Sequence, residues 1–370
     1  MKSIVGIDIG STNVRAAEVV GVDANGFAVV RKLAISPVSD GAVQSGRVKN
    51  PEEVAMSLIR VIKEGGFSKY GPVIGISSPD VALTRISLPA SVRKSERASA
   101  IKASGRSIAP TYGLEESVLS TSLIAVTAGD ETMPTSTIDV ASVRNIELEA
   151  LLAACKIAKI TPRAIDLTGA ALLRSLTRAN PQFGEVSTVV DIGATKTTIV
   201  TREGLSMRSL RTINGGGQDL TRAIMTVVDD DYRAAEERKH GLKLNNATME
   251  TLSTTYLDVD LSARKSPLDV ALSNAADLLV DAIGQAVETD AANYGNFTQG
   301  IALCGGSSLM RGIKDRIQAR VGVPVMIGRP WAEIEQTRRN SIYFKDGRPD
   351  PKVLLSIAPA VGLGLWREPA

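Results

Sequence analysis

Two short segments of this chain place a carboxylate, a glycine and a hydroxyl side chain in the same order. They run from Val5 to Arg15 and from Val189 to Thr198, and when aligned on their aspartates they share the pattern Asp-Ile-Gly-x-Thr. An apolar, β-branched run precedes each aspartate, as expected for a strand. A carboxylate at a strand end can hold Mg²⁺ through water, while the glycine turn and small hydroxyl side chains can contact phosphate oxygens.

One such segment would more simply be an ordinary hairpin turn. Two copies indicate a duplicated fold with a ligand held between its halves. We therefore expect Asp8 and Asp191 to hold Mg²⁺ through water. The expected phosphate contacts come from both segments: Gly10, Ser11, Thr12, Asn13, Arg15, Gly193, Ala194, Thr195 and Lys196.

Three further places could complete a nucleotide site. Gly216 and Gly217 open a helix after the hairpins that follow the second segment, and Gly305, Gly306 and Ser307 follow a short apolar strand. Glycines at such turns let backbone come close to an anionic or flat ligand. Glu236 and Lys239 stand three residues apart on one side of a helix, a spacing that is also typical of a surface ion pair.

The composition narrows the class of protein. The chain has 370 residues, with 44% hydrophobic, 22% charged and 4% aromatic residues and a net charge of +3. This length predicts more than one domain, and the small charge with few aromatics argues against nucleic-acid binding. The single histidine, His240, makes a zinc site improbable. We expect no signal peptide and no membrane span, hence a cytoplasmic protein with Cys155 and Cys304 as buried thiols.

The elements that must carry these residues follow from the apolar pattern. In the first half we expect strands at Ser3–Ile9, Phe27–Ile35 and Val73–Ser77, and a helix from Asn50 to about Glu64. From Ala82 the apolar pattern predicts a β-α-β-β-α unit, which is typical of an inserted domain. Its expected elements are Ala82–Leu88, Val92–Ile108, Ser117–Val126, Thr135–Ser142 and Glu147–Lys159.

The second half repeats the opening theme. Hairpins are expected over Ser187–Leu210, a helix from the Gly215–Gly217 turn to about Val228, and a long helix over Pro267–Tyr294. Gly300–Met310 reads as a strand, a glycine turn and a helix start. Ile357–Leu365 is rich in Ala, Gly and Leu, a composition suited to close helix packing.

In this order the motifs resemble the actin-like ATPase superfamily and, nearly end to end, the PilM family of type IV pilus assembly proteins. The resemblance implies an α/β actin-like ATPase fold of two RNase H-like halves with an inserted SHS2-like subdomain 1C. The implied boundaries are 1–83 and 163–187 for subdomain 1A, 84–162 for 1C, 188–230 and 291–370 for 2A, and 231–290 for 2B.

The same resemblance implies a function and further roles for single residues. ATP and Mg²⁺ would be bound, with Glu236 and Lys239 on the ribose and purine and Gly305 and Gly306 facing the adenosine. The implied partner is the N-terminal cytoplasmic tail of an inner-membrane PilN-like protein, with pilus ATPases, the platform protein and further copies of the chain as other candidates. Asp166 falls where relatives orient the attacking water.

The chain also departs from the family. Arg15 replaces the usual lysine, and Arg106–Gly113 replaces the family's Arg-Tyr-Ile-Pro-Phe segment. We expect at most slow ATP turnover. The alternative is an FtsA-like filament-forming protein, although Leu365–Ala370 does not resemble the amphipathic anchor of that family. A small-molecule kinase is a weaker alternative, since the inserted unit replaces the expected sugar pocket.

Overall fold

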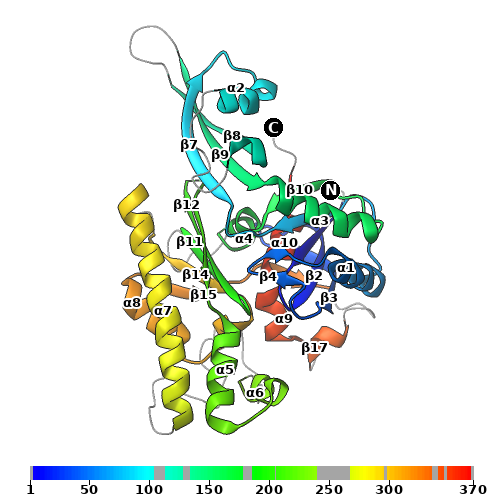
Figure 1. The fold of residues 1–370 in the computed structure, drawn as a ribbon, viewed down its shortest axis with the longest axis vertical. Helices are drawn as coiled ribbons and strands as arrows, with labels where there is room; N and C mark the ends of the chain where they lie inside the picture. Colours follow the sequence, from blue (N-terminus) through cyan, green and yellow to red (C-terminus); the bar gives the residue numbers. More distant parts are fainter. Residues whose placement is uncertain are drawn as a thin grey trace.

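The computed structural model describes residues 3–103, 113–127, 134–177, 186–204, 206–239, 267–295, 298–335, 341–345 and 348–367. Two mixed sheets stand side by side, and a third, smaller sheet projects from one end (Figure 1). The expected α/β fold class is confirmed.

The first sheet has the order β10-β6-β1-β2-β3-β16. Its strands are β10 (Ala164–Leu167), β6 (Val73–Ile76), β1 (Ile4–Ile9), β2 (Asn13–Val22), β3 (Ala28–Pro37) and β16 (Trp331–Ile334). β1, β6 and β10 run parallel, whereas β1, β2 and β3 form antiparallel hairpins.

One face of this sheet is covered by α1 (Pro51–Gly65) and α3 (Asn145–Ile157). The Asn50 side chain accepts a hydrogen bond from the Glu53 N–H at 3.1 Å and so caps the start of α1. Gly66 ends that helix in the left-handed conformation. The opposite face packs against α10 (Ala358–Gly364) and α9 (Pro351–Ser356).

The second sheet has the order β13-β12-β11-β14-β15. Its strands are β13 (Ser206–Asn214), β12 (Lys196–Glu203), β11 (Thr188–Ile192), β14 (Ile301–Cys304) and β15 (Val325–Ile327). α5 (Gly217–Val228), α7 (Pro267–Tyr294) and α8 (Ile313–Val321) bury one face, and α4 (Thr168–Leu176) packs on the other. α6 (Tyr232–Lys239) contacts α5.

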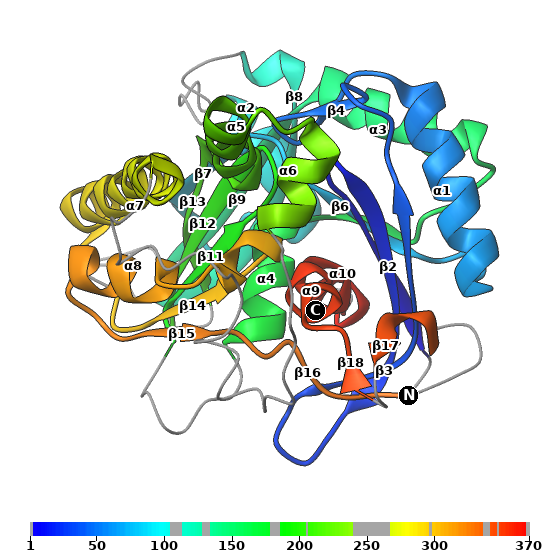
Figure 2. The same ribbon diagram turned by 90° about the horizontal axis from the view of Figure 1, so that it is seen from below.

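α4 and α10 lie between the two large sheets (Figure 2). Their backbones meet directly, because a Cβ on Gly362 would lie 1.8 Å from the Ala171 carbonyl oxygen. Gly6 of β1 makes the same kind of contact, where a Cβ would lie 2.1 Å from the Ala360 oxygen. The close packing expected for Ile357–Leu365 is thus confirmed.

The third sheet has the order β7-β9-β8, formed by β7 (Ala82–Pro89), β9 (Thr135–Arg144) and β8 (Ser117–Thr127). Together with α2 (Arg97–Ala103) it has a small apolar core of its own. The helix expected over Val92–Ile108 is a 3₁₀ turn (Lys94–Glu96) followed by α2, and residues 104–112, which include most of the divergent segment that starts at Arg106, lie outside the described residues.

α3 packs into a different hydrophobic core from the rest of the expected insert. Its buried residues Leu151, Ala154 and Cys155 belong to the core of the first sheet, where they pack with α1. Within the expected range 84–162, therefore, β7, α2, β8 and β9 share one core and α3 shares another.

Short elements complete the described chain. They are β4 (Val43–Gln44), β5 (Arg47–Val48), β17 (Phe344–Lys345), β18 (Arg348–Pro349) and 3₁₀ helices at Leu114–Glu116, Gly306–Leu309 and Ser341–Tyr343. The helix expected directly after Gly305-Gly306 is the second of these 3₁₀ helices. The α-helix α8 begins only at Ile313, after the left-handed Gly312.

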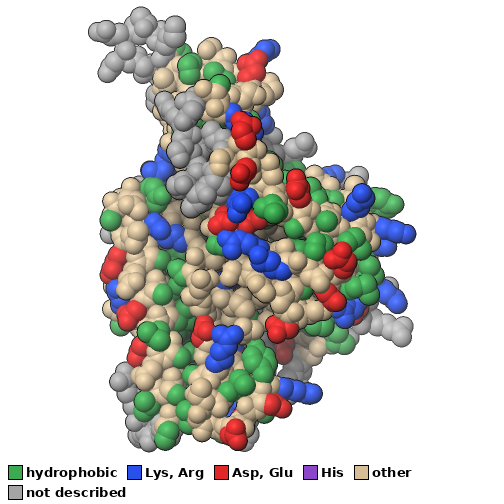
Figure 3. All heavy atoms as spheres, viewed as in Figure 1, with side chains coloured by type: hydrophobic (Ala, Val, Ile, Leu, Met, Phe, Trp, Pro, Cys, Tyr) green, Lys and Arg blue, Asp and Glu red, His purple; other side chains and the backbone are tan. Residues whose placement is uncertain are grey.

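The long helix α7 is apolar enough over Val270–Tyr294 to cross a membrane by length and composition alone. Leu272, Ala276, Leu279 and Ile283 nevertheless fill the core of the second half, which makes α7 a core helix of this fold. On the face shown in Figure 3, Lys and Arg side chains alternate with Asp and Glu rather than forming a field of one sign.

Candidate functional site: a cleft between the two halves

The two large sheets open onto one cavity of about 450 Å³. In the first sheet the parallel strands β1, β6 and β10 are followed directly by Gly10, Ser77 and Thr168. In the second, the parallel strands β11 and β14 are followed directly by Gly193 and Gly305. All five residues line the cavity, the position where ligands of open α/β sheets bind.

The two Asp-Ile-Gly-x-Thr segments form the same turn. The Gly10 N–H donates to the Asn13 carbonyl oxygen at 3.0 Å, and the Gly193 N–H donates to the Lys196 oxygen, also at 3.0 Å. The Thr195 hydroxyl reaches across the cavity and donates to the Ser11 hydroxyl at 3.0 Å. The repeat seen in the sequence is therefore a structural repeat, and its two copies face each other.

Two buried carboxylates stand at the base of these turns. Burial raises the pKa of Asp8, an effect that Arg15, with its Nη1 3.8 Å from Asp8 Oδ2, and Lys196 oppose. Burial, followed by the charge of Asp8, raises the pKa of Asp191 to about 6. A divalent cation would relieve this repulsion, so the donor set fits one.

The number of ligands fits Mg²⁺ in particular. Among the described residues no three His, Cys, Asp or Glu side chains gather around one point. Mg²⁺ commonly keeps several waters and takes one or two carboxylates in addition to substrate phosphates. Asp8 and Asp191 match that pattern.

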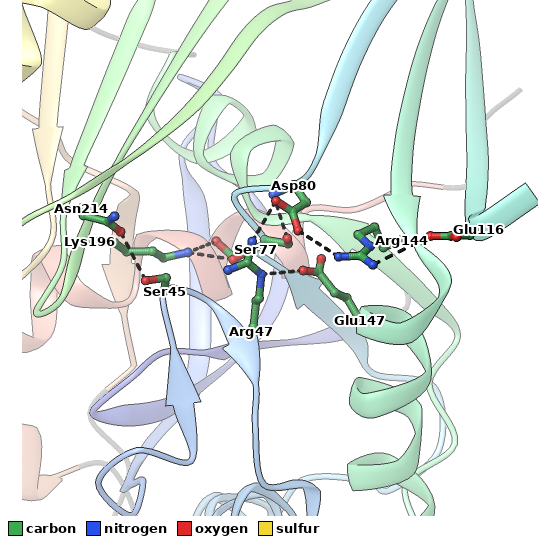
Figure 4. A network of polar contacts seen from close by, with 10 residues as sticks. Ser45, Arg47, Ser77, Asp80, Glu116, Arg144, Glu147, Lys196 and Asn214 are labelled. Carbon is green, nitrogen blue, oxygen red and sulfur yellow. Dashed lines mark hydrogen bonds and ion pairs between the residues drawn. The ribbon is translucent and has the colours of Figure 1, made fainter. Parts of the chain in front are cut away.

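Lys196 connects the two halves. Its ammonium group donates to the Ser77 carbonyl oxygen at 2.9 Å and to the Ser77 hydroxyl (Figure 4). Burial lowers the pKa of Lys196 to about 8, against the opposing charges of Asp8 and Asp191. A buried cation that lines the cavity is suited to contact a phosphate group.

Glycines are required where the backbone closes around the cavity. The Gly217 N–H donates to the Gly193 oxygen at 2.9 Å, which fastens the start of α5 to the second phosphate turn. A Cβ on Gly216 would lie 2.4 Å from that same oxygen. Gly305 has a φ of 84°, and a Cβ there would lie 2.4 Å from Asp191 Oδ1.

Glu236 and Lys239 both line the cavity, and their contacts distinguish them. Lys239 is 5% exposed, and its ammonium group donates to the Gly217 oxygen at 3.0 Å, the Thr221 hydroxyl at 2.8 Å and Glu236 Oε2 at 2.7 Å. These protein contacts use the three donors of the ammonium group. Lys239 thus holds α6 on the start of α5 and orients Glu236.

The structure brings most of the predicted residues together. The cavity is lined by Asp8, Gly10, Ser11, Thr12, Asn13, Arg15, Asp191, Gly193, Ala194, Lys196, Gly217, Glu236, Lys239, Gly305, Gly306 and Ser307. Thr195 and Gly216 lie directly beside it through the contacts described above.

Asp166, the residue that the sequence suggests for orienting the attacking water, is not among the described residues that line the cavity. Its carboxylate accepts a hydrogen bond from the Leu167 N–H at 2.9 Å and forms an ion pair with Arg174. Arg174 is itself anchored, since its Nε donates to the Gly362 oxygen at 3.0 Å.

Sequence reasoning missed Ser77 and Thr168, which both line the cavity. Ser77 follows the short buried strand β6, and Thr168 follows β10. The signal that could have found them is position: the carboxyl ends of neighbouring parallel strands meet at one edge of a sheet.

A polar network leads from the cavity to the third sheet (Figure 4). Arg47 of β5 contacts Asp80, which follows β6, and Glu147 of α3, each at 2.8 Å. Arg144 at the end of β9 lies 3.8 Å from Asp80 and 3.8 Å from Glu116. The network therefore joins the loop that carries Ser77 to α3 and to the third sheet.

Comparison with solved structures defines the class. A structure of the PilM–PilN type IV pilus biogenesis complex superposes with a TM-score of 0.73 at 21% identity, covering 98% of this chain and 97% of the other. The ethanolamine utilization protein EutJ from Carboxydothermus hydrogenoformans gives a TM-score of 0.55 at 13% identity over 99% and 90% of the two chains. The chain has an actin-like ATPase fold.

The family follows from sequence. The family model described as type IV pilus assembly protein PilM matches residues 6–346. This chain belongs to the PilM family, which confirms the resemblance drawn from its motifs.

Proposed function

We propose that this protein binds ATP with Mg²⁺ in the cleft and uses the bound nucleotide as a conformational clamp in type IV pilus assembly. The observation that carries the proposal is the pair of equivalent phosphate turns, which face each other and meet through Thr195 and Ser11. A ligand that contacts both turns would favour one relative position of the two halves.

The residues that line the cavity would contact different parts of the bound nucleotide. Asp8 and Asp191 would hold Mg²⁺ through water, and the bound cation would offset phosphate charge. The N–H groups and hydroxyls of the two turns would bind phosphate oxygens, with Lys196 and Arg15 supplying positive charge. Glu236 and the Gly305–Ser307 turn would bind the adenosine. Turnover is at most slow, because Asp166 is held by Arg174.

The partner that fits this family is the N-terminal cytoplasmic tail of a PilN-like inner-membrane protein. The solved PilM–PilN structure is a complex of these two proteins. We place the docking surface on the inserted unit, 84–162, which we assign to subdomain 1C, with 1A, 2A and 2B bounded as predicted from sequence. The protein would then act in the cytoplasm at the inner face of the membrane.

The polar network gives nucleotide and partner a physical connection. Lys196 donates to Ser77, and Ser77 and Asp80 belong to the same loop. Arg47 ties this loop to α3 through Glu147. A phosphate that attracts Lys196 would compete with Ser77 for its ammonium group, and the change would reach Arg47 along the loop that carries Ser77 and Asp80.

The nucleotide part is tested by calorimetric titration of the purified protein with Mg²⁺–ATP. Asp8→Ala should abolish binding, because it removes a carboxylate that faces the metal. Asp315→Ala is the matched control, since that side chain is 73% exposed on α8, and it should bind as the wild type does. Equal ATP affinity in the Asp8 and Asp315 variants would refute the site.

The docking part is tested by the affinity of a peptide from the cytoplasmic tail of a PilN-like protein, with and without nucleotide. We expect tighter binding in one nucleotide state than in the other. Arg47→Met should leave nucleotide affinity unchanged while removing that difference. Arg93→Met, at a side chain that is 79% exposed just before the 3₁₀ turn next to the third sheet, should keep that difference. A nucleotide effect that survives Arg47→Met would exclude this route.

A further inference from the structure

One hydroxyl group at the edge of the cavity is buried and unpaired within the described part of the chain. Thr168 is 3% exposed and lines the cavity, and its Oγ1 has no hydrogen-bond partner among the described residues. A buried hydroxyl left unpaired costs stability, so an orphan of this kind calls for an explanation.

The surrounding backbone makes room for that hydroxyl. Gly75 lies on the neighbouring strand β6, and a Cβ there would come to 2.8 Å from Thr168 Oγ1. Any other residue at position 75 would crowd the hydroxyl. The space at Oγ1 therefore depends on Gly75 having no side chain.

Thr168 is also the first residue of α4, a nine-residue helix. The residue before it, Leu167, provides no side-chain cap. The N–H groups in the first turn of a helix have no partner within the helix and carry partial positive charge, which favours an anion. The nearest acid along the chain, Asp166, has its charge offset by Arg174.

Strand order places this group at the phosphate end of the cleft. β10, β6 and β1 are neighbours, so Thr168, Ser77 and Gly10 follow one another along the same sheet edge. Lys196 reaches this row from the opposite sheet and contacts Ser77. The adenosine-binding candidates Glu236 and Gly305 belong to the other half of the molecule.

We propose that the Thr168 hydroxyl and the N-terminus of α4 bind the terminal phosphate of a nucleoside triphosphate, and that this contact distinguishes the triphosphate from the diphosphate. The proposal rests on the nucleotide site proposed above and adds a residue and a selectivity to it. It concerns binding only, so it applies whether or not the protein hydrolyses ATP.

The test compares two ligands in three variants of the full chain. Mg²⁺–ADP and the Mg²⁺ complex of the non-hydrolysable analogue AMPPNP are titrated calorimetrically. Thr168→Val keeps the shape of the side chain without the hydroxyl and should weaken AMPPNP binding about tenfold, the loss typical of a hydrogen bond to a charged group, with ADP affinity within twofold. Thr168→Ser should restore AMPPNP affinity. Thr226→Val, at an exposed threonine of α5 whose hydroxyl donates within its own helix, is the matched control.

Thermal unfolding of the ligand-free variants supplies an independent readout. Because the hydroxyl has no hydrogen-bond partner in the described ranges, Thr168→Val should leave the melting temperature unchanged or raise it. A clear decrease would show that the hydroxyl has a structural partner and would overturn the proposal. Equal losses of ADP and AMPPNP affinity, or no loss, would overturn it while leaving the nucleotide site intact. Absence of binding of either nucleotide to the wild type would overturn both.

Discussion

Replacing Asp191 by asparagine should change stability in opposite directions with and without ligand. The pKa of Asp191 is raised from its ordinary value of 3.8 to about 6 by burial and by the charge of Asp8. This difference corresponds to about 3 kcal/mol of folding free energy lost at neutral pH, when the carboxylate is ionised. Because the carboxylate lines a cavity open to water, we expect Asp191→Asn to raise the folding stability of the ligand-free protein by about 1–3 kcal/mol at neutral pH.

The pH dependence gives this prediction its sign. Between about pH 4 and pH 6 the folded carboxyl keeps its proton while the unfolded one loses it, so the wild type loses stability as the pH rises through this interval. The asparagine variant has no such loss. Its advantage over the wild type should therefore grow from pH 4 to pH 6 and stay constant above.

Chemical denaturation in EDTA, at several pH values, measures the ligand-free part. Thermal unfolding with Mg²⁺–ATP measures the other part, and here Asp191→Asn should show little or none of the stabilisation seen in the wild type. Asp315→Asn, at an exposed position, should match the wild type in both assays. A ligand-free Asp191→Asn protein less stable than the wild type at pH 7.5, or one that keeps the full ligand effect, would refute the electrostatic reasoning.

Three further substitutions probe the framework of the site. Gly46→Ala should destabilise the protein by more than about 1 kcal/mol in urea unfolding, because Gly46 has a φ of 83° and a Cβ would lie 1.6 Å from the Ser77 oxygen; wild-type stability would contradict this. Lys239→Met should cost about 1–3 kcal/mol and weaken ATP binding, since the Gly217 oxygen, the Thr221 hydroxyl and Glu236 each lose one hydrogen-bond donor; intact ATP affinity would show that the lysine has no positioning role. Gly6→Ala should abolish soluble expression or lower the melting temperature by several degrees, as its Cβ would overlap the α10 backbone, and an unchanged melting temperature would exclude that contact.

The parts of the site that are local in sequence could be predicted from sequence. In each phosphate turn the carboxylate, glycine and hydroxyl lie within five residues, so the motif and its geometry come together. The cap of α1 is local in the same way: Asn50, Pro51 and Gly66 mark its ends. Long-range pairing decides the rest. Ser77 and Thr168 join the cavity only because β6 and β10 pair parallel beside β1, which no local pattern reveals.

Ion pairs and packing partners were the least predictable features. Position along the chain suggested Asp166 as a water-orienting residue, but it could not show that Arg174 takes its carboxylate. Similarly, α3 has an apolar face that any core could bury. The position of α3 against α1 depends on where β9 ends, because α3 follows β9 directly. It also depends on Arg47, which forms an ion pair with Glu147 at the start of α3.

The glycine contacts of α10 bear on how the two halves could rotate. Most helix crossings interlock side chains, so a change of angle requires many rotamers to repack. Where Gly362 meets Ala171, the two backbones touch without side chains between them. Small changes of angle at this crossing need little repacking. The same lack of side chains means that the crossing does little to fix any one angle. Polar contacts across the cleft, among them those of Thr195, Lys196 and Ser45, would contribute to fixing it.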